Sequence, residues 1–504
     1  MSRKTRTRSA PGFQSAAARP ARAPSAFERR AQALGRSPLA FALASAALLL
    51  PCFWQSRIQA GDLSSHIYNA WLTQLIETGR TSGLALVPQS TNVLVDAILT
   101  TLLRAMGPDA AQRITVGLCV LVFAWGAFAF VSAVSGRRAW HLFPAIAILA
   151  YGWTFHMGFF NFYLSLGLGL FALAAAWTWK PKGLAAAAAL LAVAYLAHGL
   201  GVAWAGALLV YRWLALRSGE RGMPGLLGLA AGAIVVLRLA LELQTRTRWS
   251  SQQILAVTAA DQASVYGARY LVPLAGLLLL WAVLFIALLR QQGIRRLSTS
   301  LPFHLWLLTA AGIFLIPTAV EIPGNQHALV AFIADRMSLA LGVCYCALLA
   351  GARPPAFARY LALAVMLLFF GFLYRDDAVL NRYEDRMRAA VMQLKDQRVV
   401  TGINDPAPRV NPFPHMIDRA CLGVCYSYAN YEPSSGHFRV RAREENPFVA
   451  STYEHSWLLQ NGMYVVQPRD VPLYRVDLDA DGAMVVRAVP AGATTGMTNW
   501  DLLQ

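Results

Sequence analysis

The sequence has few charged residues. Only 14% of its 504 residues are Asp, Glu, Lys or Arg, against roughly 25% in soluble domains, whereas 57% are hydrophobic. Its six cysteines are scattered and show no spacing typical of a zinc site. These shortages argue against a soluble enzyme and against a zinc-binding domain. The net charge of +18 does not indicate nucleic-acid binding, because much of it lies in an amino-terminal tail and in short loops between apolar runs.

Long apolar runs are abundant instead. They recur over the first 375 residues, and the mean hydropathy is +0.44. About 20 apolar residues in a helix cross a hydrocarbon core of ~30 Å, so the runs predict an all-α polytopic membrane protein. The prediction is about eleven transmembrane helices, at residues 37–56, 114–135, 140–155, 161–179, 183–198, 200–216, 223–241, 268–290, 301–319, 327–350 and 357–374.

The loops between these runs predict an orientation. Residues 1–36 are basic and lack an apolar period, which is typical of a disordered cytoplasmic tail. With the amino terminus inside, every cytoplasmic loop of the eleven-helix topology is basic, as the positive-inside rule requires. Residues 57–112 then form the first outer loop. Within it, residues 92–106 are predicted to be a surface helix, because this stretch is short and carries Asp96 and Arg104.

The composition changes after Tyr374. A charged helical segment, 375–395, precedes short runs of β-branched and aromatic residues separated by Pro, Gly and Asn, which is typical of a small α+β domain. We therefore predict a transmembrane domain at 37–374 and an extracytoplasmic domain at 375–504. The arrangement and the Ala- and Arg-rich composition favour a bacterial inner membrane, with this domain in the periplasm. The predicted strands are 398–402, 437–442, 463–467, 473–478 and 484–488.

The stretch Gly61–Leu72 opens the first outer loop. Read as a helix, it places Asp62 and His66 one turn apart on one face. Asp62 could cap the helix, or it could act as a general base or hold a metal, and the sequence leaves these readings open. Ionisable groups near membrane depth are costly and by default mark a functional site. Other polar residues predicted at the outer ends of spans are His156, Asn161, His198, Arg238, Glu321, His327, Asp335 and Arg336.

The first part of the chain has four features in order. They are one span, an outer loop opening with Gly61-Asp62-x-x-x-His66, an amphipathic stretch, and a span that ends on Gly136-Arg137-Arg138. This order resembles the GT-C superfamily of integral-membrane glycosyltransferases. The chain looks similar to protein O-mannosyltransferases and lipid A aminoarabinose transferases. The resemblance covers residues 37–375 as architecture and 61–80 as a motif. Residues 61–80 lack the Asp-Glu and Asp-x-Asp pairs that some subfamilies show.

The resemblance implies that a sugar moves from a polyprenyl-phosphate-linked donor to an extracytoplasmic glycan, lipid or protein, next to membrane lipids. Asp62 matches the essential acidic residue of the first loop, with His66 as its nearest ionisable neighbour. Arg336 is the first candidate for the donor phosphate. Arg238 is the second, although Glu242 lies one turn away and could simply pair with it. The sequence identifies no cofactor with certainty, and a divalent cation held by His66, His156 and His198 stays open.

Residues 415–435 are rich in side chains that bind sugars. Tyr428, Asn430, Tyr431 and Glu432 are predicted to contact the acceptor, and the alternative is that the tyrosines pack inward. Cys421 and Cys425 lie on the predicted oxidising side, where they could form a disulfide or stay free. Two other functions stay open: a transporter or flippase of lipid-linked glycans, and a non-catalytic GT-C-like protein of envelope assembly.

Overall fold

The computed structural model describes residues 37–321 and 329–503. The chain divides into two compact units, residues 1–44 and 45–504, and everything below concerns the second. Helix α2 (Pro38–Leu49) begins in the first unit and ends in the second. The predicted cytoplasmic tail and the candidate His327 lie outside the described residues.

Within the described residues, four helices are long and apolar enough to cross a membrane: α4 (Leu94–Ser135), α9 (Gly199–Gln244), α11 (Leu271–Gln292, counted from Ala268 with its preceding turn) and α15 (Ala356–Val391). Each predicted span contains a helix among the described residues, but the count of eleven spans stays a prediction, because most of these helices are shorter than a membrane crossing requires. The other helices of this part are α3 (Leu63–Glu77), α5 (Phe143–Ala150), α6 (Trp153–His156), α7 (Phe160–Ala176), α8 (Pro181–Ala197), α10 (Gln252–Ala256), α12 (Ile294–Ser298), α13 (Leu301–Leu315) and α14 (Ile333–Leu349).

Two of the long helices are interrupted by glycine. Gly107 in α4 has φ +80° and Gly219 in α9 has φ +60°, backbone angles that favour glycine. The first interruption separates the predicted surface helix from the predicted second span. The second separates the spans predicted at 200–216 and 223–241. Both long helices therefore consist of two arms each.

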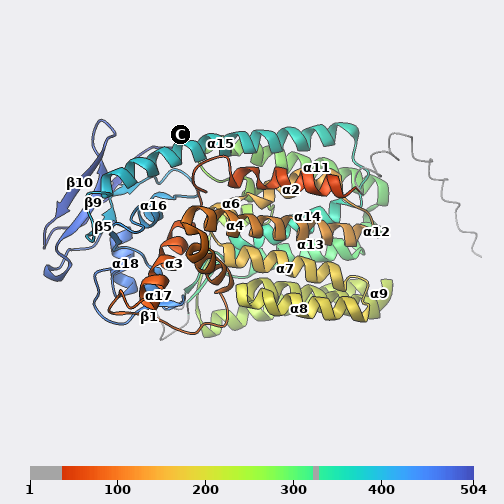
Figure 1. Ribbon diagram of the computed structural model, residues 1–504. Coiled ribbons are helices and arrows are strands. Elements are labelled where there is room, and N and C mark those ends of the chain that lie inside the picture. Colours follow the sequence, from red (N-terminus) through yellow and green to blue (C-terminus); the bar gives the residue numbers. More distant parts are fainter. Residues whose placement is uncertain (1–36, 322–328, 504) are drawn as a thin grey trace, which may run out of the picture. The chain divides into compact units, whose positions relative to one another are not determined.

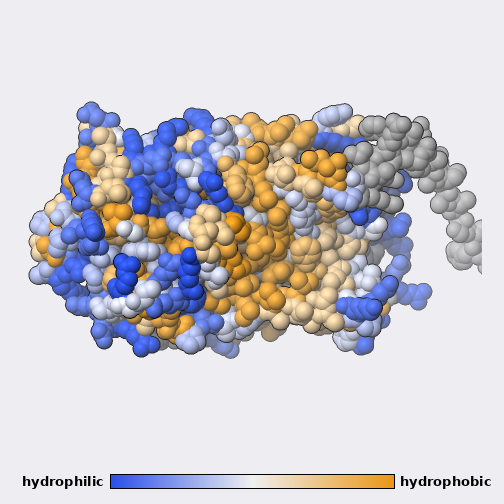
Figure 2. Space-filling model, viewed as in Figure 1, coloured by the Kyte–Doolittle hydropathy of each residue, from blue (hydrophilic) through white to orange (hydrophobic). Residues whose placement is uncertain are grey.

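The helices pack closely where small residues meet. A methyl group added to Gly126 of α4 would lie 2.4 Å from the carbonyl oxygen of Gly167 in α7, so the two backbones touch here. Small residues allow such close approach between helices in membranes, where apolar surfaces gain little from leaving lipid. Helix α7 also contacts α8 and α9, and α13 contacts α14 (Figure 1). Hydrophobic residues gather over the face of these helices, as Figure 2 shows.

The carboxyl-terminal segment contains a four-stranded sheet of order β10-β9-β5-β7. Strand β5 (Arg398–Thr401) is parallel to β7 (Tyr426–Ser427) and to β9 (Leu473–Leu478). Strand β9 pairs antiparallel with β10 (Met484–Val489). The remaining strands are β1 (Leu84–Leu86), β2 (Arg246–Arg248), β3 (Ala319–Glu321), β4 (Leu329–Val330), β6 (Ile403–Asn404), β8 (Val440–Ala442) and β11 (Thr498–Asn499), and the remaining helices are α16 (Phe413–Ala420), α17 (Glu432–Ser435) and α18 (Tyr453–Gln460).

One strand prediction was wrong, and another strand is shorter than predicted. Residues 463–467 form no strand, and Val465 makes only a single bridge to Thr494. The strand predicted at 437–442 is shorter, and as β8 it pairs with β1 of the first outer loop instead of the carboxyl-terminal sheet. Alternating side chains show that a segment can be extended, but its partner is set by tertiary structure.

The compositional change at Tyr374 lies inside α15, which continues to Val391. One face of its charged half is buried, and each of the buried carboxylates there has a partner. Asp376 accepts a hydrogen bond from Tyr270, and Asp377 accepts one from Trp54. Glu384 pairs with Arg419 of α16 through two contacts of 2.6 Å. These contacts tie the carboxyl-terminal segment to the first outer loop and to the apolar helices.

Candidate functional site

The start of α3 is held by the backbone of the segment between α6 and α7. The amide of Gly61 donates to the carbonyl of His156 at 2.7 Å, and the amide of Asp62 donates to the carbonyl of Met157 at 3.0 Å. Gly158 follows with φ +85°. Asp62 occupies the N-cap position of α3, but its side chain makes no capping hydrogen bond. The capping interpretation of Asp62 therefore fails, and its carboxylate faces other partners.

The first partner of Asp62 is His415 of α16. Its Nε2 lies 3.6 Å from Oδ1 of Asp62, and its Nδ1 lies 3.2 Å from Oδ2 of Asp418. The Asp418 carboxylate is buried and also accepts a hydrogen bond from Ser427. The imidazole therefore lies between two carboxylates, one from α16 itself and one from the start of α3. The two helices contact each other (Figure 1).

A second histidine also lies between two carboxylates. The Nδ1 atom of His66 is 3.0 Å from Oδ1 of Asp96 and 3.3 Å from Oε1 of Glu432. Burial lowers the pKa of His66, but the charges of Glu432, Asp96 and Asp62 outweigh it and raise this pKa to about 10. Burial raises the pKa of Glu432 above its ordinary value, and the charge of His66 opposes this. His66 is thus an imidazolium at neutral pH.

Neighbouring polar groups fix these carboxylates. The Ser65 hydroxyl donates to Glu432 at 2.7 Å. The Asn161 amide donates to Asp96 at 3.1 Å, and its oxygen accepts the amide of Val95 at 2.9 Å. Asn161 therefore orients both the Asp96 side chain and the first turn of α4. Asp62 and Asp96 lie at or near helix N-termini, where the helix dipole stabilises negative charge.

Arg336 of α14 contributes the positive charge. Its guanidinium lies 3.9 Å from the ring centroid of Phe159, and one of its nitrogens lies 3.4 Å from Nε2 of His198. His198 caps α9 by accepting the amide of Leu200 on Nδ1 at 3.1 Å. The Nε of Arg336 is buried without a hydrogen-bond partner among the described residues. Arg336 therefore keeps hydrogen-bonding capacity for a ligand.

Tyr431 lies among these groups. Burial raises the pKa of its hydroxyl, the charges of Asp62 and Glu432 raise it further, and Arg336 lowers it. Its ring contacts the ring of His415 at 5.6 Å between centroids. The side chains that the structure brings together, which we call the acid–base cluster, are Asp62, His66, Asp96, His198, Arg336, His415, Asp418, Tyr431 and Glu432.

Several predicted site residues have other partners. Arg238 pairs with Glu242 at 3.0 Å and is partly exposed, which is the simple pairing that its spacing allowed. Glu321 pairs with Arg248 at 3.5 Å. Asp335 pairs with Arg409 at 3.2 Å. These contacts separate the three residues from the acid–base cluster, so we no longer assign them to the site.

The remaining predictions concern His156, Tyr428 and Asn430. The backbone carbonyl of His156 accepts the amide of Gly61, but its buried ring contacts Tyr266 and not the acid–base cluster. Tyr428 packs in the hydrophobic core of the carboxyl-terminal segment and donates to Asp470 at 2.8 Å, so the inward-packing alternative holds for it. Asn430 is fully buried and donates to Ser65 at 2.9 Å. Neither Tyr428 nor Asn430 is available to a sugar.

Sequence reasoning missed Asp96, His415 and Asp418. Asp96 looked like a surface residue of an amphipathic helix, and nothing in its neighbourhood marked it as a partner of His66. The spacing of His415 and Asp418 places them on one helix face, and this was the available signal. No group of three or more His, Cys, Asp or Glu side chains suited to a metal occurs among residues 37–321 and 329–503.

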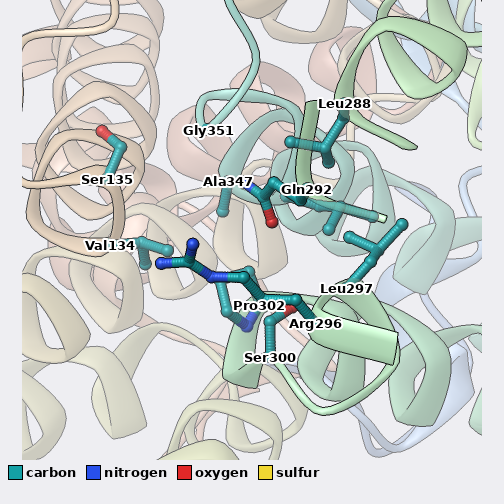
Figure 3. A pocket seen from close by; sticks show the side chains of 11 residues that line it. Val134, Ser135, Leu288, Gln292, Arg296, Leu297, Ser300, Pro302, Ala347 and Gly351 are labelled. Atoms are coloured by element: carbon teal, nitrogen blue, oxygen red, sulfur yellow. The ribbon is translucent and has the colours of Figure 1, made fainter. Parts of the chain in front are cut away.

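A cavity of about 280 Å³ lies elsewhere, between the ends of α4, α11 and α14 and the loop around α12 (Figure 3). Leucine side chains and Arg296 line it, and it shares no residue with the acid–base cluster. Its elements carry the loops that the topology predicts to be cytoplasmic. This cavity is therefore separate from the candidate site.

Cys421 and Cys425 form a disulfide directly after α16, while the four other cysteines are free and buried. In comparisons with known proteins, no family model, no curated protein and no solved structure matches the chain.

Proposed function

We propose that this protein is a membrane glycosyltransferase of GT-C type. It transfers a sugar from a polyprenyl-phosphate-linked donor to an extracytoplasmic glycan, lipid or protein. The observation that carries the proposal is the acid–base cluster. In it, the charges of the Asp62 carboxylate and of the Arg336 guanidinium both act on the hydroxyl of Tyr431, beside apolar helices that suit a membrane.

Each group has a role in the proposed reaction. Asp62 takes the proton from the acceptor hydroxyl or amine, whose oxygen or nitrogen then bonds to the anomeric carbon. The bond between that carbon and the phosphate oxygen breaks, and the polyprenyl phosphate leaves with the electron pair. Arg336 offsets the negative charge that grows on this phosphate. The aromatic ring of Phe159 beneath its guanidinium holds Arg336 in place.

The location of the cluster supports an extracytoplasmic reaction. It joins the starts of α3 and α4 with α16 and α17, segments that the loop charges predict to be outside the cytoplasm. A bacterial inner membrane with a cytoplasmic amino terminus belongs to the same proposal. Reporter fusions after Lys182 and after Tyr374 test the topology, because the proposal requires them to lie on opposite sides of the membrane.

The activity test uses wild-type protein and Asp62→Ala in nanodiscs, with radiolabelled polyprenyl-phosphate sugars and a membrane extract as acceptor. The wild type should transfer label, and Asp62→Ala should lose roughly 10²–10⁴-fold in rate, the range expected for a general base. Asp109→Ala is the matched control, because Asp109 is an exposed aspartate near the start of the second arm of α4.

Two results would count against the proposal. Transfer by Asp62→Ala at the wild-type rate removes Asp62 from the mechanism. No transfer by the wild type with any donor, together with movement of labelled lipid between leaflets, indicates a flippase.

A further inference from the structure

His415 has a carboxylate at each ring nitrogen. Nδ1 lies 3.2 Å from Oδ2 of Asp418 in a hydrogen bond, and Nε2 lies 3.6 Å from Oδ1 of Asp62 in an ion pair. The side chain is 14% exposed. A neutral imidazole carries a proton on only one nitrogen, so only the imidazolium can present N–H to both carboxylates. The geometry therefore favours a charged His415.

Asp62 is engaged on one side only. Its ion pair involves Oδ1, and among the described residues Oδ2 has no ion-pair or hydrogen-bond partner. The carboxylate therefore has one oxygen that is held and one that is free. A general base needs this arrangement, because its orientation must be fixed while one lone pair stays available for the proton.

We propose that His415 is a positioning residue for Asp62: it holds Oδ1 through the ion pair, so that Oδ2 takes the proton of the acceptor. This inference rests on the proposed function and deepens it. Asp418 is the second positioning residue, because it holds the opposite nitrogen of the ring. No substrate contact is assigned to His415 or to Asp418.

The charges around His415 come from four elements. Asp62 precedes α3, and His66 lies on it. Asp418 lies on α16, Glu432 begins α17, and Arg336 lies on α14. Burial lowers the pKa of His415, but the hydrogen bond that its ring donates to Asp418 and the charges of Asp62, Asp418 and Glu432 outweigh it. The resulting pKa lies above the ordinary value of 6.5. The imidazolium form is thus favoured at neutral pH.

The next turn of α16 is fixed by contacts of its own. Arg419 donates to both oxygens of the buried Glu384 at 2.6 Å, and its remaining nitrogen donates to the Ile58 carbonyl at 3.0 Å and to Gln112 at 2.9 Å. These contacts tie α16 to α15, to the first outer loop and to α4. The helix that carries His415 is therefore held in place by buried contacts one turn beyond the imidazole.

The experiment compares wild type with His415→Gln, which can keep an N–H donor but carries no charge. Because a neighbouring positive charge favours the ionised form of a carboxylate, losing it should move the acidic limb of kcat/KM to higher pH. We expect kcat to fall about 10²-fold, as for a base displaced by ~1 Å, with unchanged donor binding. His455→Gln is the matched control, because the ring of His455 contacts the ring of Tyr464 edge to face and has no carboxylate partner among the described residues.

A second measurement does not need transfer. The infrared carboxyl band of protonated Asp62, identified by its loss in Asp62→Asn, gives the protonation midpoint directly. A higher midpoint in folded His415→Gln supports the inference, and an unchanged midpoint overturns it. If the midpoint is higher in His415→Gln but the wild-type protein transfers no sugar, only the proposed function is overturned. The positioning of Asp62 by His415 then stands.

Discussion

Gly158 is the residue whose substitution should displace Asp62 most directly. Its φ is +85°, and a methyl group added to it would lie 2.6 Å from the amide nitrogen of Asp62 and 2.9 Å from that of Leu63. Both atoms belong to the backbone, so rotating a side chain cannot relieve the contact. The two segments would have to separate by roughly 0.8 Å to reach ordinary contact.

Gly158→Ala therefore has two costs. The left-handed backbone costs an alanine about 1–2 kcal/mol. Separation also weakens the two hydrogen bonds that Gly61 and Asp62 donate to this segment, each worth about 1 kcal/mol. Because Asp62 moves by nearly 1 Å, transfer should fall about 10²-fold.

Gly79→Ala is the control for backbone strain. Gly79 follows α3 with φ +67°, and a methyl group there would meet nothing within 4 Å. It should lose a similar 1–2 kcal/mol of stability from the left-handed backbone but keep its transfer rate. The assay is sugar transfer in nanodiscs, with thermal stability followed by size-exclusion chromatography. Equal transfer by Gly158→Ala and Gly79→Ala would refute the reasoning that this glycine positions Asp62.

Three further outcomes follow from buried contacts. Glu384→Ala should lower the free energy of unfolding by about 3–5 kcal/mol, because it leaves the buried guanidinium of Arg419 unpaired. The double variant Glu384→Leu with Arg419→Met should recover most of that loss. Thermal denaturation in detergent measures both variants. Replacing Cys421 and Cys425 by serine should lower the free energy of unfolding by about 2 kcal/mol, because the unfolded chain is then no longer restricted by the closed loop. The same assay, run without reductant, measures this loss. The pKa of His66 is raised to about 10. Its imidazolium therefore contributes its full stabilisation of the folded state below about pH 6.5, and this contribution is lost as the pH rises toward 10. The free energy of unfolding should fall less steeply over this pH range in His66→Gln.

The sequence predicts the helical part well, because runs of apolar residues need no knowledge of distant partners. It also identifies Asp62, His66, Arg336 and Glu432, since the predicted topology places all of them on one side of the membrane. The arrangement within the site is a different matter. His415 follows Asp62 by more than 350 residues, and only the packing of α16 against α3 brings them together.

Other predictions failed because a local pattern has several tertiary outcomes. The tyrosine-rich segment suggested a sugar-binding surface, but Tyr428 packs inward because its hydroxyl has a buried carboxylate partner. Arg238 has its partner one turn away on the same helix, so its charge is already satisfied. Asp96 was missed because an aspartate at a helix N-terminus is common on protein surfaces.

The most direct test of the proposed role of Asp62 is a single-turnover measurement on Asp62→Asn with a radiolabelled donor bound in advance. Asparagine keeps the size of the side chain but cannot take the acceptor proton. We predict unchanged donor affinity and a transfer step slower by roughly 10²–10⁴-fold. A single-turnover rate equal to that of the wild type, at equal donor occupancy, would contradict the account.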